Sequence, residues 1–117
     1  MVFQHKKFAA GKWQELSLME QLGNIGSEIS RALHWQGKDE KFFQGAVKRA
    51  LELFELTLKD SRWKGRLREI VRARELFLDA VFGKNEYKTS LKDLEQYFFY
   101  FAFAHRSGLL DYERKNC

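Results

Sequence analysis

Basic side chains are concentrated between positions 59 and 74 of this 117-residue sequence, where seven residues are Lys or Arg and only two are acidic. Lys64, Arg68 and Arg72 recur every four residues, so on a helix they would share one face. Such a row of positive charge attracts phosphate groups and acidic proteins. A solvated helix face with surface ion pairs has the same pattern. The row therefore indicates a surface for RNA, a nucleotide or an acidic protein, with the solvated face as the alternative.

Two further polar side chains interrupt apolar series. Arg74 stands between Ile70 and Phe77, and His105 follows Phe101 at the end of the next series. Burial of an unpaired guanidinium is costly, so we expect Arg74 to meet a carboxylate, a carbonyl or a bound anion, or to reach water at the end of the fold. An anion pocket would use Arg74 as the charge and His105 as a donor. With a carboxylate partner, Arg74→Met alone should cost about 3 to 5 kcal/mol.

Residues 97–103 are aromatic around nearly the whole circumference of a helix. Phe98 fits the apolar stripe of its segment, whereas Phe99, Tyr100 and Phe103 point to other sides. A helix that is apolar all round is covered on more than one side, here by the N-terminal segment, a ligand or another subunit. We expect a homodimer whose interface contains Phe99, Tyr100 and Phe103.

The elements that carry these residues are helical. Apolar residues at three- and four-residue spacing predict four helices: the first from Ser17 to 35–37, the second over 39–59, the third starting after 60–61 and stopping at Gly83, and the fourth from Ser90 to Gly108. Short connections favour antiparallel neighbours. The predicted fold is all-α, an antiparallel up-down four-helix bundle with a short basic N-terminal extension.

Small residues within the first predicted helix have a packing role of their own. Gly23 and Gly26 lie inside a strongly periodic helical pattern, with Ser27 and Ser30 following. Residues of this size let another helix approach closely. We expect a close helix crossing here, within the chain or across subunits.

The composition sets limits on the class of protein. Hydrophobic residues make up 44% of the chain and charged residues 32%, proline is absent, and the formal net charge is +5. We expect a single domain over 1–117, with 1–13 and 109–117 as flexible or covering ends. Cys117 is the sole cysteine. No apolar run is as long as a membrane span, and the first residues lack the apolar stretch of a signal peptide. We therefore expect the protein to be cytoplasmic and to have no membrane partner.

Four acidic residues give the first resemblance to a known family. Glu52 and Glu55, followed by Glu75 and Asp79, resemble the carboxylate set with which MazG-like nucleotide pyrophosphohydrolases hold Mg²⁺ against a triphosphate. The resemblance implies an all-helical hydrolase. Glu75 and Asp79 are four residues apart where the family has three, and Glu52 lies opposite the apolar stripe, where we expect a solvated surface.

Two other resemblances concern families of helical proteins, and the first of them rests on size and helical architecture. The chain is similar to HEPN-type helical domains, whose nucleases carry Arg and His four to six residues apart in one helix. Here Arg31 and His34 are closer than that, and no Arg precedes His105 at that distance. Segments 15–33 and 91–106 resemble an uncharacterised prokaryotic family of small helical proteins, which implies no activity.

These patterns together predict a small helical binding module. Its binding residues would be Lys64, Arg68, Arg72, Arg74 and His105. The alternative is an enzyme, either a Mg²⁺-dependent nucleotide pyrophosphohydrolase or a ribonuclease. No catalytic or metal-ligating set can be named from the residues, and we expect no cofactor.

Overall fold

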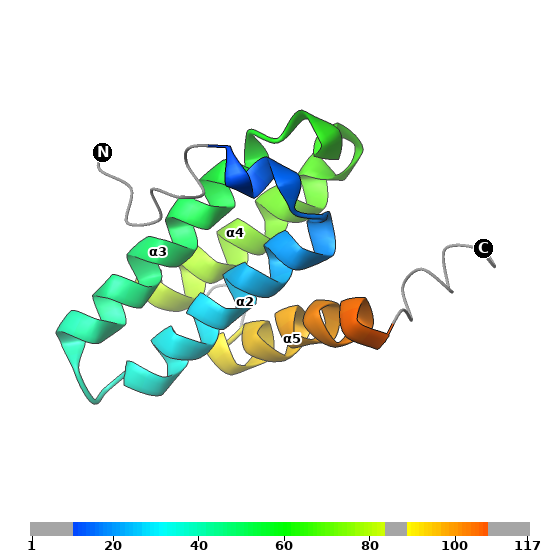
Figure 1. The fold of residues 1–117 in the computed structure, drawn as a ribbon. Helices are drawn as coiled ribbons and strands as arrows, with labels where there is room; N and C mark the ends of the chain where they lie inside the picture. The colour runs from blue at the N-terminus through cyan, green and yellow to red at the C-terminus, as the bar shows by residue number, and fades with distance from the viewer. Residues whose placement is uncertain (1–10, 84–88, 108–117) are drawn as a thin grey trace.

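A computed structural model describes residues 11–83 and 89–107, with side chains up to residue 100. Four α-helices and two short 3₁₀ helices, without a strand, make up this part of the chain (Figure 1): η1 Lys12–Glu15, α2 Leu18–Trp35, α3 Glu40–Leu58, η2 Ser61–Arg66, α4 Leu67–Phe82 and α5 Leu91–Ser107. The predicted all-α class is confirmed. Among the helices described, none has both the length and the apolar character needed to cross a bilayer.

Two helices start at the predicted residues, Ser17 and Ser90, and each start has a reciprocal side-chain cap. The Ser17 hydroxyl accepts a hydrogen bond from the Glu20 amide at 3.1 Å, and the Glu20 carboxylate accepts one from the Ser17 amide at 3.0 Å. Ser90 and Asp93 form the same reciprocal pair ahead of α5. Each pair satisfies amides that the first helical turn leaves without partners.

The predicted third helix is wrong over its first turns. Residues 61–66 form η2, and the α-helix begins only at Leu67. Trp63 leaves helical geometry (φ −103°, ψ 22°), and its indole N–H donates to the side chain of Gln21 at 2.9 Å. Because this long-range bond holds the turn, local periodicity does not decide its shape. Lys64 therefore lies outside α4.

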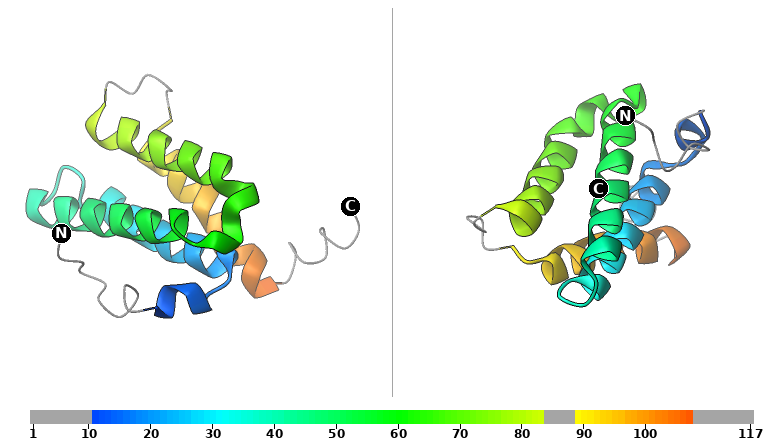
Figure 2. Two further views of the ribbon diagram at one scale, coloured as in Figure 1. Left: turned by 90° about the horizontal axis from the view of Figure 1, so that it is seen from above. Right: turned by 90° about the vertical axis from the view of Figure 1, so that its left-hand side faces the viewer.

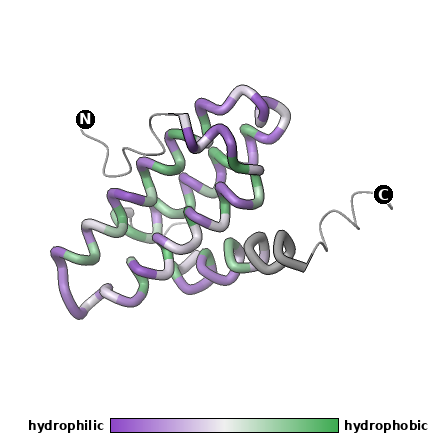
Figure 3. Tube along the Cα trace, in the orientation of Figure 1, coloured by the Kyte–Doolittle hydropathy of each residue, from purple (hydrophilic) through white to green (hydrophobic). Residues whose placement is uncertain are grey.

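Three helices run along one another and the fourth lies across them. The chain passes through α2, α3 and α4 in alternating directions (Figure 1), while α5 crosses α2 obliquely in both views of Figure 2. The helix α2 makes the most extensive contacts, with α3 and with α5, and α3 also packs against α4. Hydrophobic and hydrophilic residues alternate along the helices (Figure 3), as amphipathic packing requires.

The core is built around a cluster of phenylalanines. Phe54 of α3 lies 5.9 Å, between ring centroids, from both Phe77 of α4 and Phe98 of α5. All three side chains are fully buried. The three rings place α3, α4 and α5 around one hydrophobic core, to which α2 contributes Ile25 and Ile29. The expected core position of Phe98 is confirmed.

A glycine sets the approach of α5 to α2. A Cβ atom placed on Gly26 would lie 2.7 Å from the Cβ of Phe98, closer than carbon atoms pack. The backbone of α2 can meet Phe98 here only because position 26 has no side chain. The close helix crossing predicted from the small residues is confirmed at Gly26.

Buried hydrogen bonds close the end of the fold where η1 meets η2. The indole of Trp13 is fully buried and donates to the Thr57 hydroxyl at 3.0 Å. The side-chain amide of Gln21 donates to the Trp13 carbonyl at 2.8 Å and to the Asp60 carboxylate at 3.0 Å. The indole of Trp63 donates to the same Gln21 side chain. Trp13 thus belongs to the fold, whereas residues 1–10 and 108–117 of the predicted ends lie outside the described residues.

Asp60 makes this cluster sensitive to acid. The hydrogen bond from the Arg62 guanidinium, assisted by that from Gln21, lowers the pKa of the buried Asp60 carboxyl to about 2, although burial opposes the shift. A carboxyl with a lowered pKa in the folded state stabilises the fold above its unfolded pKa. This stabilisation is lost as the pH falls from the ordinary value of 3.8 towards 2.

We predict that acid removes about 2 kcal/mol of stability through Asp60. Urea unfolding at pH 5 and at pH 2 measures this loss in the wild type. Asp60→Asn should be less stable at pH 5 and should lose correspondingly less between the two pH values. An equal acid-induced loss in both proteins would show that Asp60 is not the titrating group.

Candidate functional site

A groove separates α4 from α5. Because α5 packs mainly on α2, it leaves a pocket of about 250 Å³ on the side that faces α4. Three apolar residues, Ala73, Leu76 and Leu94, line this space. The remaining lining residues are polar or aromatic: Arg72, Thr89, Asp93 and Tyr97. We call this pocket the α4–α5 groove.

Tyr97 forms the aromatic side of the α4–α5 groove. Its ring packs edge-on against Phe98, with 5.3 Å between the ring centroids. Phe98 is fully buried and so fixes the position of its neighbour, while about half of Tyr97 stays exposed. Burial of the other half, together with the nearby Glu69 carboxylate, raises the pKa of the Tyr97 hydroxyl. The groove thus presents a neutral, anchored aromatic ring to solvent.

Two exposed arginines of α4 lie at or beside the α4–α5 groove, on the side opposite Tyr97. Arg68 and Arg72 are both exposed and lie one helical turn apart, and Arg72 lines the groove. Lys64 is exposed too, but it belongs to η2. The single row of three cations predicted on one helix is therefore wrong. Only Arg68 and Arg72 keep the predicted four-residue spacing on α4.

Other cations of the 59–74 segment serve the fold. The guanidinium of Arg62 binds Asp60 at 2.7 Å and lies over the ring of Trp63. Arg66 forms an ion pair with Glu69 on the neighbouring turn. These pairs lower the net positive charge of the segment, whose exposed cations outside them are Lys59, Lys64, Arg68 and Arg72.

Arg74 lies apart from the α4–α5 groove. It faces α3, where its Nη2 atom is 3.6 Å from a carboxylate oxygen of Glu55. The Nε atom is buried and forms no hydrogen bond within the described residues. A third of the side chain is exposed, so Arg74 both reaches water and lies beside a carboxylate, two of the alternatives that the sequence left open. The side chain of His105 lies outside the described residues, and the shared anion pocket stays a prediction.

A buried carboxylate that the sequence analysis missed lies on α2. Glu28 is 4% exposed, and its two oxygens bind Arg31 at 2.5 Å and Arg49 of α3 at 3.0 Å. The sequence does indicate the pair between Glu28 and Arg31, since these residues are three apart on one helix. Arg49 is distant in sequence, and no local pattern points to it.

The carboxylates of the MazG-like resemblance are found in different surroundings. Glu52 is 1% exposed, so the expectation of a solvated surface is wrong. The physical reason is that α3 packs against both α2 and α4, which widens its buried face beyond the predicted stripe. Glu55 pairs with Arg74, and Glu75 is exposed. Within the described residues, no three His, Cys, Asp or Glu side chains are grouped to hold a metal ion.

Comparison with protein-family models, with curated proteins and with solved structures finds no match for this chain. The resemblances described above therefore stay predictions, and the candidate site rests on its own geometry.

The position of Arg74 predicts a small role in stability. Arg74→Met should change the free energy of unfolding by less than about 1 kcal/mol, because the ion pair with Glu55 is partly solvated. Arg49→Met is the matched comparison and should cost about 2 kcal/mol or more, because it removes a cation from the buried Glu28. Chemical denaturation of both variants measures the difference. A loss above about 3 kcal/mol for Arg74→Met would mean that this charge is enclosed after all.

Proposed function

We propose that this chain is a single binding module, an up-down four-helix bundle with its fourth helix turned across the second, that holds single-stranded RNA in the α4–α5 groove. One observation carries the proposal: Arg72 and Tyr97 line the same groove, whose floor is apolar. Arg68 continues the positive charge one turn along α4, and Lys64 adds to it from η2.

Proteins that bind single strands combine cations for the phosphates with aromatic rings on which bases stack. Arg72 contacts a phosphate at the groove, Arg68 contacts the next phosphate one turn along α4, and a base stacks on the exposed part of Tyr97. Ala73, Leu76 and Leu94 then cover the rest of the base. A double helix keeps its bases stacked inside, so it cannot bring one against Tyr97.

Asp93 adds a hydrogen-bond acceptor to the α4–α5 groove. Its carboxylate lines the same groove and accepts a hydrogen bond from the Ser90 amide, which lowers the pKa of Asp93 and keeps it ionised. The carboxylate can accept hydrogen bonds from the amino group of a base or from a ribose hydroxyl.

Binding to a labelled single-stranded RNA, followed by fluorescence anisotropy over a range of salt concentrations, tests the proposal. Affinity should fall with salt by a logarithmic slope of roughly 0.7 per phosphate contact. Arg72→Gln should lower that slope by about one contact. Tyr97→Ala should weaken binding by about 5- to 150-fold, the equivalent of 1 to 3 kcal/mol of stacking, with the slope unchanged.

The control for charge is Lys41→Gln, which removes an exposed cation from α3 without touching the groove. Its salt slope should equal that of the wild type. The proposal is contradicted if Lys41→Gln and Arg72→Gln have equal effects, if duplex RNA binds as tightly as the single strand, or if the wild type does not bind RNA at low salt.

A further inference from the structure

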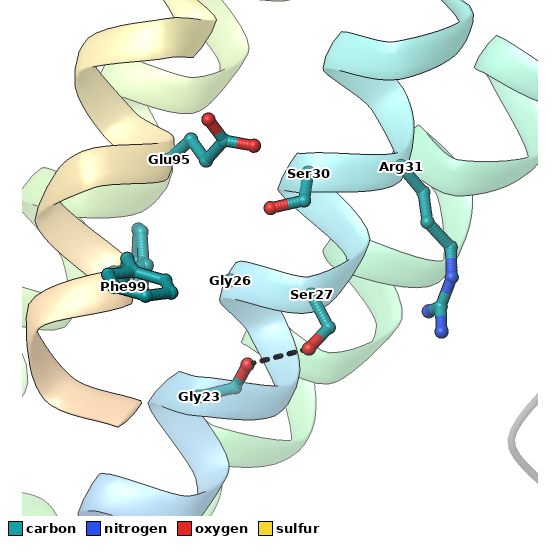
Figure 4. A pocket seen from close by; sticks show the side chains of 8 residues that line it. Gly23, Gly26, Ser27, Ser30, Arg31, Glu95 and Phe99 are labelled. Atoms are coloured by element: carbon teal, nitrogen blue, oxygen red, sulfur yellow. Dashed lines mark hydrogen bonds between the residues drawn. The ribbon is translucent and has the colours of Figure 1, made fainter. Parts of the chain in front are cut away.

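A second groove lies between α5 and α2 (Figure 4). Its volume is about 400 Å³, and its α2 side consists of small residues together with Arg31: Gly23, Gly26, Ser27, Ser30 and Arg31. The α5 side consists of Glu95, Phe98 and Phe99. A neighbouring cavity shares Ser30, Glu95 and Phe99 with it and so extends the groove along the helices. We call this continuous space the α2–α5 groove.

Phe99 is the apolar feature of this surface. Its side chain is 61% exposed, the largest exposure among the bulky hydrophobic residues that the structure describes. It borders both cavities of the groove, beside the small residues of α2 (Figure 4). Small residues leave room for an incoming ring to reach the helix surface. An exposed ring next to a space of this kind is typical of an interface between proteins.

The two charged residues that line the groove, Arg31 and Glu95, do not pair with each other. Arg31 donates one hydrogen bond to Glu28, and 57% of its side chain stays exposed, so a guanidinium with five N–H donors can still meet a second carboxylate. Glu95 forms no ion pair or hydrogen bond with another residue of the described part. Figure 4 shows Glu95 projecting from α5 towards Ser30, while the side chain of Arg31 is directed away from it. One groove thus presents opposite charges that are not paired with each other.

We propose that the α2–α5 groove is the interface with a second copy of this chain, related by a two-fold axis. In such a dimer each surface meets its own copy, so every contact occurs twice. Phe99 of each copy packs on the small residues of the other. Arg31 of each copy approaches Glu95 of the other, which pairs the charges that are separated within one chain.

The groove fits a second copy better than it fits RNA. A copy of this chain brings an aromatic ring to the small residues and a positive charge to Glu95, whereas RNA carries no positive charge. The two grooves use different sides of α5, because Asp93, Leu94 and Tyr97 line one and Glu95 and Phe99 the other. Dimer formation therefore leaves the α4–α5 groove accessible. Tyr100 is exposed but does not line the α2–α5 groove, and the side chain of Phe103 lies outside the described residues.

Sedimentation equilibrium tests this interface directly. The wild type should have twice the chain mass of 13.9 kDa and should dissociate on dilution. Phe99→Ser should raise the dimer Kd by about 30-fold or more, as expected when an interface aromatic is removed. The matched control is Phe82→Ser, because Phe82 is 59% exposed but does not line the groove. Its Kd should equal that of the wild type.

Charge reversal separates this interface from any other apolar association. Glu95→Arg and Arg31→Glu should each weaken the dimer, because each places like charges opposite one another. An equimolar mixture of the two variants should form a heterodimer, because both cross-pairs are then of opposite sign. Circular dichroism of each variant shows that it is folded.

Three results would overturn the proposal. The first is a wild type that stays monomeric at about 100 µM, a concentration well above the Kd of a functional dimer. The second is an equal effect of Phe99→Ser and Phe82→Ser. The third is a mixture of folded charge variants that stays monomeric. None of these results affects the RNA experiment, which reports on the other groove.

Discussion

The contact between Gly26 of α2 and Phe98 of α5 is the constraint on which the arrangement of the helices depends. There is no room for a Cβ atom at position 26, since it would lie 2.7 Å from that of Phe98. Phe98 also packs on Phe54 of α3, so the same ring that meets α2 holds α5 to the core. A close approach at one point lets α5 cross α2 obliquely, as Figure 2 shows.

The oblique course of α5 leaves space on both of its sides. Three consecutive residues consequently meet three different surroundings: Tyr97 lines the α4–α5 groove, Phe98 enters the core, and Phe99 borders the α2–α5 groove. The aromatic run therefore does not form one apolar surface. Its central ring stabilises the fold, and its two neighbours provide the proposed contacts with a base and with a second copy of the chain.

Features that depend on nearby residues could be predicted from the sequence, and features that depend on distant ones could not. The predicted helix starts at Ser17 and Ser90 are found, and each is held by a cap between residues three positions apart. The burial of Glu52 depends on which helices flank α3, and the turn at Trp63 depends on Gln21. At the candidate site, Arg72 was predicted from its spacing along the chain. The groove beside it arises from the course of α5, which periodicity does not encode.

The measurement that tests this account most directly compares two glycine-to-alanine variants by urea unfolding. Both positions lie inside helices, where alanine is favoured over glycine by about 1 kcal/mol. At Gly45 the new methyl group would lie 3.3 Å from a terminal nitrogen of Arg49, which a shift of a few tenths of an ångström relieves, so Gly45→Ala should change stability little. Gly26→Ala should instead lose about 1 to 3 kcal/mol, because it forces α2 and α5 apart. Equal stability of the two variants would contradict the close crossing.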